Sequence, residues 1–179
     1  INGKITINNK DEINLVLKKL DEFLKIHIMY QKDAGVDVVQ IFDSWAGLIK
    51  DDDLEEYCYN PNKSLIDFCK KNKIPSICFP RGIKEKYKNF IQKVKPDAVN
   101  IDYEIDPLWA KENLGKTCIQ GGMKPDLLLK SEKAVLQEVE KYLEIFKSNP
   151  YIFNLGHGIL PETNPEIIKK IVDRTKLIK

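Results

Sequence analysis

The sequence predicts an α/β fold, because short β-branched runs alternate along the chain with longer stretches of helical periodicity. This alternation is typical of repeated βα units. Apolar strands separated by helices indicate a parallel sheet that is covered on both faces. At 179 residues, of which 42% are hydrophobic and 31% charged, the chain is long enough for one core-bearing domain and too short for two large ones.

Each expected element has its own local signal. The first helix carries an apolar stripe that should face a core, and Gly35 ends it. Asp106, Ser131 and Asn164 are the residues expected to cap later helices. The stripe residues are Ile13, Val16, Leu17, Leu20, Leu24 and Ile28. The expected strands are 36–42, 74–79, 98–101, 117–120 and 151–155, and the later helices are 61–73, 84–95, 106–115, 131–147 and one that begins at 164.

Two architectures contain such strands, a doubly wound open sheet and a (β/α)8 barrel. An open Rossmann sheet should carry a glycine-rich phosphate turn after its first strand, and the chain has neither G-x-G-x-x-G nor a Walker sequence. A complete barrel needs eight strands and roughly 200 to 250 residues, whereas this chain supplies about five strands. The sequence therefore predicts about the C-terminal half of a (β/α)8 barrel, over residues 1–179 with no internal domain boundary.

Composition excludes several classes of function. With 29 basic and 27 acidic residues, the net charge of +2 is too small and too interspersed for a nucleic-acid-binding surface. No apolar run approaches the roughly 18 residues of a membrane span. The first residues, Ile1 to Lys4, contain neither an initiator Met nor a signal-peptide core, so we expect a truncation or proteolytic boundary there.

The cysteines and histidines predict a reducing, cytoplasmic compartment and no structural metal. The four cysteines form no C-x-x-C pair, and a chain of this size needs no disulfides. The two histidines, His27 and His157, lie far apart, with no cysteine two or three positions away. Local spacing therefore offers no zinc site, although it says nothing about ligands that meet only in three dimensions.

Polar residues and glycines follow every expected strand, at the carboxyl ends where parallel α/β architectures place their sites. We expect these loops to meet at one rim. They contain Asp43-Ser44-Trp45, Pro80-Arg81-Gly82, Asp102-Tyr103, Gln120-Gly121-Gly122 and Gly156-His157-Gly158.

Three residues of these loops are candidates for ligand contact. His157 lies between two glycines, which lets imidazole and backbone approach a ligand closely; the alternative is a turn histidine bonded to backbone. Arg81, one of two arginines, suggests an anion contact, with a surface ion pair as the alternative. Ser44 is an activated nucleophile or, more commonly, a hydroxyl that binds substrate or caps a helix, and G-x-S-x-G is absent.

Two aspartates at strand ends have two interpretations. Asp43 and Asp102 could form an acid/base pair, since both follow strands. An Asp in this position also caps the next turn or helix, and we favour that structural role.

Five sequence stretches carry a family resemblance. They are AGVDVVQIFDSWAG (34–47), FPRG (79–82), NIDY (100–103), IQGGMKP (119–125) and FNLGHGILP (153–161). In order, and over effectively the whole chain, they resemble the C-terminal half of the uroporphyrinogen decarboxylase family. The first and last stretches are long and specific.

The resemblance implies a (β/α)8 barrel of the cytoplasm that is dimeric in the family and acts in haem and porphyrin biosynthesis. Enzymes of this family remove the four acetate carboxylates of uroporphyrinogen III, giving coproporphyrinogen III, without any cofactor. The resemblance assigns substrate contact to Ser44, in the Phe-Asp-Ser-Trp motif, and to His157, in Gly-His-Gly. Arg81 is added as a weaker candidate for contact with the substrate.

The resemblance also implies that part of the enzyme is missing. The family's main catalytic groups are an arginine pair, an Asp that binds the pyrrole N–H groups and a Tyr, all in the first half of the fold. Arg81 and Arg174 are a poor supply of cations for a substrate with so many carboxylates. We therefore expect an inactive fragment whose partner is the missing N-terminal half.

Two positions depart from the family's pattern. Lys124 lies in Gln-Gly-Gly-Met-Lys-Pro where the family usually has Gln-Gly-Asn-Leu-Asp-Pro, and Tyr103 occupies a position where Trp is usual. Either change is expected to alter the pocket or a helix start.

Two alternatives compete with the decarboxylase. One is a non-catalytic interaction module, in which a half-barrel with two exposed strand edges docks on a partner or on another copy of itself. The other is a cobalamin-linked methyltransferase of the same superfamily, which binds zinc through a His-x-Cys pair and a later Cys. The chain has no His-x-Cys and no Cys near His157, so this alternative is the weaker one.

Overall fold

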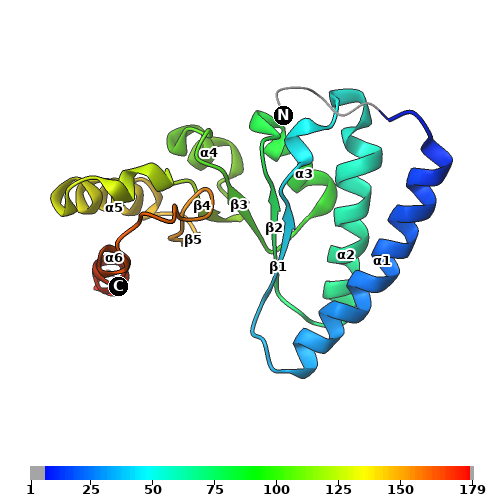
Figure 1. Cartoon of the computed structure of the whole chain (residues 1–179), viewed down its shortest axis with the longest axis horizontal. Coiled ribbons are helices and arrows are strands. Elements are labelled where there is room, and N and C mark those ends of the chain that lie inside the picture. The colour runs from blue at the N-terminus through cyan, green and yellow to red at the C-terminus, as the bar shows by residue number, and fades with distance from the viewer. Residues whose placement is uncertain (1–6, 178–179) are drawn as a thin grey trace. The chain divides into compact units, whose positions relative to one another are not determined.

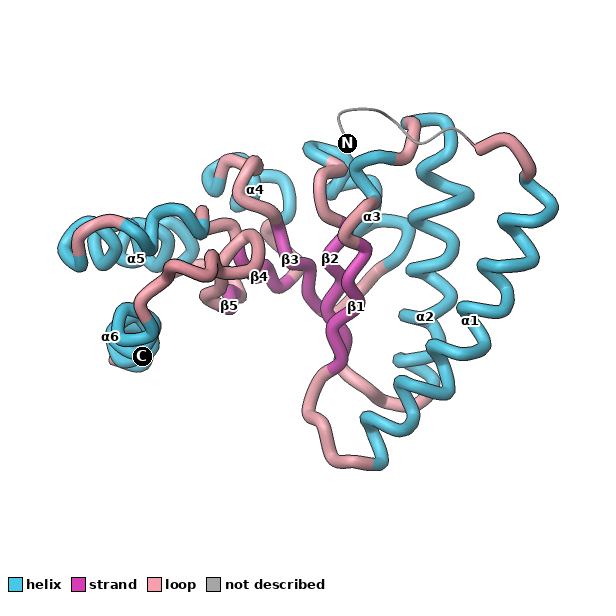
Figure 2. Tube along the Cα trace, in the orientation of Figure 1, coloured by secondary structure: helices cyan, strands magenta, loops and turns pink. Residues whose placement is uncertain are grey.

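The computed structural model describes residues 7–177, in which helices alternate with short strands (Figures 1 and 2). The strands in this range are β1 (Val39–Asp43), β2 (Ser76–Pro80), β3 (Ala98–Ile101), β4 (Cys118–Gly121) and β5 (Tyr151–Ile152). The helices are α1 (Lys10–Asp33), α2 (Asn60–Lys71), α3 (Tyr87–Val94), α4 (Pro107–Leu114), α5 (Glu132–Phe146) and α6 (Pro165–Lys176). Short 3₁₀ or π-helical turns lie in the loops, at η1 (Ala46–Leu48), η2 (Asp51–Asp53), η3 (Glu55–Tyr59), η4 (Lys84–Lys86) and η5 (Pro125–Leu129). Ile1 to Lys4, on which the expected truncation rests, lie outside the described residues.

The strands are parallel and follow one another in the order of the sequence, β1-β2-β3-β4-β5. The chain divides into two compact units, the first ending at Val99 and the second beginning at Asn100, so that β3 contributes residues to each. The predicted α/β fold with five parallel strands is confirmed. A sequential order is typical of a (β/α)8 barrel, whereas a doubly wound sheet reverses its order at a switch point. That residues 1–179 form one domain stays a prediction.

The first unit is built on an apolar cluster shared by α1, β1 and α2. Its buried members are Ile28, Val39, Leu65, Cys69 and Ile74. Phe68 packs half-buried against them, so the inward positions predicted for the second helix are confirmed. All residues of β2 are buried, as expected for a parallel strand with neighbours on both sides.

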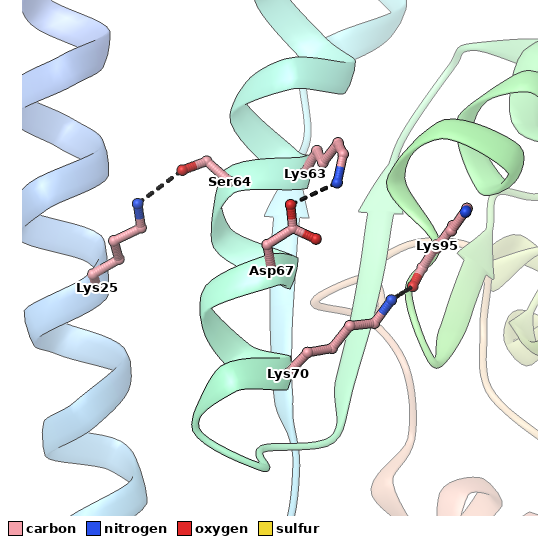
Figure 3. A network of polar contacts seen from close by, with 6 residues as sticks. All are labelled: Lys25, Lys63, Ser64, Asp67, Lys70 and Lys95. Atoms are coloured by element: carbon pink, nitrogen blue, oxygen red, sulfur yellow. Dashed lines mark hydrogen bonds and ion pairs between the residues drawn. The ribbon is translucent and has the colours of Figure 1, made fainter.

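Polar contacts link consecutive helices of this unit (Figure 3). Lys25 Nζ donates to Ser64 Oγ at 2.8 Å and joins α1 to α2, which lie side by side. Lys70 Nζ donates to the carbonyl oxygen of Lys95 at 2.5 Å and joins α2 to the end of α3. Lys95 closes α3 in the left-handed conformation, with φ at +56°.

In the second unit, α5 buries one apolar face. The buried positions, spaced four, three and four residues apart, are Val135, Val139, Tyr142 and Phe146. Phe146 stacks on Tyr151 of β5 with ring centroids 4.4 Å apart. α6 packs against α5, and an ion pair between Arg174 and Glu140 joins the two helices. The guanidinium of Arg174 is therefore already engaged within the unit.

The first helix differs from the prediction that its stripe faces a core. Ile28 is the buried residue of α1, whereas Val16 and Leu20 are 56% and 48% exposed. Phe23 and Tyr30, near the same line along the helix, are 65% and 69% exposed. The reason is that α1 packs on α2 through the side that carries Ile28 and the half-buried Ile13 and Leu17, whereas the side that carries Val16 is exposed. Periodicity identifies an apolar stripe but not what covers it.

Two of the three predicted helix caps make the expected hydrogen bonds, and the last strand is shorter than predicted. Asp106 and Asn164 occupy the expected N-cap positions and accept backbone hydrogen bonds. Ser131 occupies the N-cap of α5, but its side chain makes no capping hydrogen bond. The last strand is two residues long instead of five, although Leu155 still forms a parallel bridge with Met123.

No helix among the described residues is both long and apolar enough to cross a membrane.

We predict that Asp106→Ala destabilises the protein by about 1 kcal/mol. Its carboxylate accepts from the backbone N–H groups of Leu108 and Trp109, both at 2.9 Å, and alanine leaves both donors without that acceptor. Ser131→Ala is the matched control, since it removes a cap residue that makes no capping bond. Urea denaturation measures both variants, and an equal loss in the two would contradict the prediction.

Candidate functional site

Backbone contacts join the loops that follow β1 and β2 in the first unit. Arg81 N–H donates to the carbonyl of Asp43 at 3.1 Å, and Gly47 N–H donates to the carbonyl of Arg81 at 2.8 Å. A Cβ on Gly47 would lie 2.6 Å from the carbonyl oxygen of Gly82, so only glycine permits this approach. The two loops therefore hold the residues around them, including Ser44, in fixed backbone positions.

Ser44 and Arg81 lie in these two loops with side chains that are open to a ligand. Ser44 is exposed and Arg81 is half-buried. Neither side chain makes a hydrogen bond or ion pair with the described residues. The surface ion pair considered for Arg81 is therefore not seen in residues 7–177, and ligand binding by both residues stays a prediction.

A small cavity lies beside the same two loops. It has a volume of about 180 Å³ and is lined by residues that include Gly47, Gly82, Lys84 and Lys86. Lys86 pairs with Asp51, another lining residue, at 3.2 Å. Pockets for drug-sized ligands measure roughly 300–1,000 Å³, so this cavity by itself is too small for a tetrapyrrole.

Asp43 points into the layer of helices. Its Oδ2 accepts from Asn62 Nδ2 at 3.0 Å, and the same nitrogen donates to the carbonyl of Cys58 at 2.9 Å. Burial raises the pKa of the Asp43 carboxyl above its usual value, and hydrogen bonds from Cys58 and Asn62 oppose the rise. Asp43 thus joins β1 to α2, a structural role, although its carboxylate bonds to a side chain within α2 and not to the turn or helix start that it was expected to cap.

Asp102, in the second unit, makes a turn contact of the kind predicted. Its Oδ1 accepts from the backbone N–H of Glu104 at 3.0 Å. The residue is buried, with 2% of its surface exposed. The structural role favoured for this aspartate from its position therefore has a hydrogen bond to support it.

A buried amide pair supports the turn after β4. Gln120 Nε2 donates to Asn100 Oδ1 at 2.7 Å, and Asn100 Nδ2 donates to the carbonyl of Ile101. Both amides are almost fully buried, at 4% and 2% exposed. Sequence reasoning did not assign Asn100 a role, although a polar residue inside the apolar run 98–101 was the available signal. Because buried amides must be paired, this contact fixes the start of the loop.

The loop after β5 brings His157 to Tyr103. Gly156 packs so closely that a Cβ on it would lie 2.3 Å from the backbone nitrogen of Tyr103. Its N–H donates to the carbonyl of Met123 at 2.8 Å. The His157 ring then lies 6.5 Å from the Tyr103 ring, and its Nδ1 accepts from the N–H of Gly158. The exposed imidazole keeps Nε2 for a ligand, so both interpretations of this histidine fit the geometry.

The thiols are buried or half-buried and do not gather into a metal site. All four cysteines are free. Burial raises the pKa of the Cys58 and Cys78 thiols, which disfavours the reactive thiolate. In the part of the chain that the structure describes, no three or more His, Cys, Asp or Glu side chains are grouped as metal ligands would be.

Parallel strands in sequential order, with polar loops at their carboxyl ends, define an α/β protein of the TIM-barrel class. A family model described as uroporphyrinogen decarboxylase (URO-D) matches residues 3–177. The chain belongs to the uroporphyrinogen decarboxylase family.

Individual relatives agree with this assignment. A uroporphyrinogen decarboxylase of Cereibacter sphaeroides (strain ATCC 17025 / ATH 2.4.3) is 34% identical over 174 residues, covering 95% of this chain and 51% of the relative. That of Jannaschia sp. (strain CCS1) is 39% identical over 146 residues, covering 80% and 43%. That of Wolbachia sp. subsp. Brugia malayi (strain TRS) is 34% identical over 176 residues, covering 97% and 50%. The chain spans about half the length of these curated relatives.

We predict that Gly156→Ala destabilises the second unit by roughly 1–3 kcal/mol, because the new methyl group meets backbone atoms that cannot move aside. Gly158→Ala changes the other side of His157, where a Cβ meets nothing within 4 Å. Thermal and urea denaturation compare the two variants. Equal stability of both would contradict the close backbone contact at Gly156.

We also predict that Asp43→Asn changes how stability depends on pH. Because the folded pKa of Asp43 lies above its usual value of 3.8, its stabilising contribution is present below that pH and is lost as pH rises through the folded pKa. An amide does not titrate, so the variant should gain stability relative to wild type between pH 4 and 7. Urea denaturation across this range measures the difference, with the exposed Asp52→Asn as control. Parallel profiles for wild type and Asp43→Asn would contradict the prediction.

Proposed function

We propose that this chain is the C-terminal half of a uroporphyrinogen decarboxylase, which removes the four acetate carboxylates of uroporphyrinogen III to give coproporphyrinogen III in haem biosynthesis. The observation that carries the proposal is the family match over nearly the whole chain, together with its coverage of about half of each relative. The whole enzyme then acts in the cytoplasm as a homodimer, without a cofactor.

Ser44, Arg81 and His157 are the residues that we assign to substrate binding. Two facts support them: each lies after a strand, and each has a polar group that is open to a ligand in its own unit. Decarboxylation requires protonation of a pyrrole carbon, so that the ring accepts the electron pair of the breaking C–CO₂ bond. Carbon dioxide leaves, the side-chain carbon takes up a proton to become a methyl group, and the ring carbon releases the proton that it had accepted, so one proton is consumed for each carboxylate removed. The protein's contribution is to hold the carboxylates and to supply an ordered polar site.

The missing N-terminal half is the partner that we propose for the first unit. The exposed stripe of α1, which contains Val16, Leu20, Phe23 and Tyr30, is an apolar surface with no cover among the described residues. β1 is an edge strand, and its Phe42 is 65% exposed. In a closed barrel every strand and helix has a neighbour on each side, so half a barrel exposes such surfaces.

A non-catalytic interaction module is the second candidate, since the same exposed surfaces favour docking on a partner or on another copy of the chain. The two candidates differ in the effect of adding a complementary half to the chain. The decarboxylase requires a complementary half and then turns over substrate. The module self-associates or binds its partner, and it turns over no substrate even when the complementary half is present.

We predict that the 179-residue chain alone forms no coproporphyrinogen, and that coexpression with the preceding half of a relative restores activity. Incubation with uroporphyrinogen III under reducing conditions, followed by chromatography of the oxidised porphyrins, measures both. Turnover by the chain alone would overturn its inactivity as a fragment. No turnover by the folded pair would overturn the decarboxylase assignment and favour the module.

In the active pair, we predict that His157→Ala lowers kcat/KM by roughly 10²-fold or more, because a group in contact with the reacting substrate is lost. The control is His27→Ala, which removes the other histidine at an exposed position of α1. Equal kcat/KM of the two variants would contradict the assignment of His157 to substrate contact.

A further inference from the structure

The two positions that depart from the family's usual pattern meet in the second unit. Lys124 Nζ lies 5.8 Å from the centre of the Tyr103 ring, within the range of a cation–π contact. The imidazole of His157 lies 6.5 Å from the centre of the same ring. Tyr103 is thus an aromatic surface shared by a permanent cation and by the histidine of the last loop.

The backbone fixes this arrangement. Lys124 lies between Met123 and Pro125, both of which are buried. Met123 pairs with Leu155 in a parallel bridge, and its carbonyl accepts from the N–H of Gly156, directly before His157. A buried neighbour on each side and two links to the last loop hold the Cα of Lys124 near the Gly156-His157 backbone.

The ammonium of Lys124 has N–H donors that remain available to a ligand. Its ion-pair partner is Asp126, at 3.1 Å. Both side chains are about half-exposed, at 50% and 57%, so water competes with this pair and a stronger anion can replace it. An ammonium has three N–H donors, and one carboxylate does not use them all.

We propose that Lys124 binds a carboxylate of the substrate beside His157, with the Tyr103 ring holding the ammonium in place. The inference rests on the proposed function, because it assumes a polycarboxylate tetrapyrrole at these loops. Lys124 thereby adds a cation to the strand-end loops of the second unit, whose sequences contain no arginine. A lysine meets a carboxylate as a point charge, so it favours a substrate with more carboxylates without fixing one orientation.

The test uses the fluorescent oxidised porphyrins uroporphyrin, with eight carboxylates, and coproporphyrin, with four. Binding to the 179-residue chain is measured by fluorescence anisotropy at low and high salt. Lys124→Gln should weaken uroporphyrin binding roughly fivefold at low salt, and by less at high salt, because an exposed charge pair is lost and salt screens it. Lys124→Asp should weaken it further, and Lys124→Arg should retain it.

The matched control is Lys130→Gln, which removes an exposed lysine at the end of η5. It should bind uroporphyrin like the wild type, and thermal melts should show that every variant is as folded as the wild type. If the wild-type chain binds uroporphyrin and Lys124→Gln binds it equally well, the role of Lys124 is overturned while the proposed function stands. If the wild-type chain binds neither porphyrin, both alone and coexpressed with the preceding half, substrate contact by these loops is overturned, and the role of Lys124 with it.

Discussion

Direct packing of backbone on backbone between neighbouring loops is the constraint on which the strand-end residues depend. At Gly47 and Gly156 a neighbouring main chain occupies the space that any Cβ would need. Each contact is reinforced by a hydrogen bond, from Gly47 to the carbonyl of Arg81 and from Gly156 to the carbonyl of Met123. These contacts restrict the backbone of the loops, and buried apolar residues next to them, such as Ala46 and Met123, anchor the same segments in the core.

Buried polar side chains provide a second level of support. Asn62 donates a hydrogen bond to Asp43 in the first unit, and Asn100 accepts one from Gln120 in the second. Such groups are costly to bury unless they are paired, and each pairing is possible in few geometries. The aspartates and amides at the strand ends therefore stabilise the loops. Exposed neighbours such as Ser44 and His157 remain accessible to a ligand.

Much of the fold was predictable from the sequence, because apolar strands and capped helices are local features. The spacing of Leu65, Phe68 and Cys69 identified the inner face of α2, and Asp106 identified the start of α4. The exposure of Leu20 was not predictable, since periodicity does not reveal whether a stripe has a neighbour. The residues of the candidate site were found by position, at strand ends. The contact of Lys124 with Tyr103 was not, because the two residues lie far apart in sequence and meet through a turn and a bridge.

The sequential order of the strands has a consequence for how such a protein is assembled. Since β1 pairs with β2, and β4 with β5, each strand bonds to the one that follows it, and every such pairing spans an intervening helix, as from Val39 to Ser76 and from Ile119 to Tyr151. Two paired strands can therefore meet only after the helix and loops between them have been placed, and parallel pairing over such separations is intrinsically slow. Because every strand pairs with the strand that follows it in the chain, the sheet can grow strand by strand in the order of the sequence.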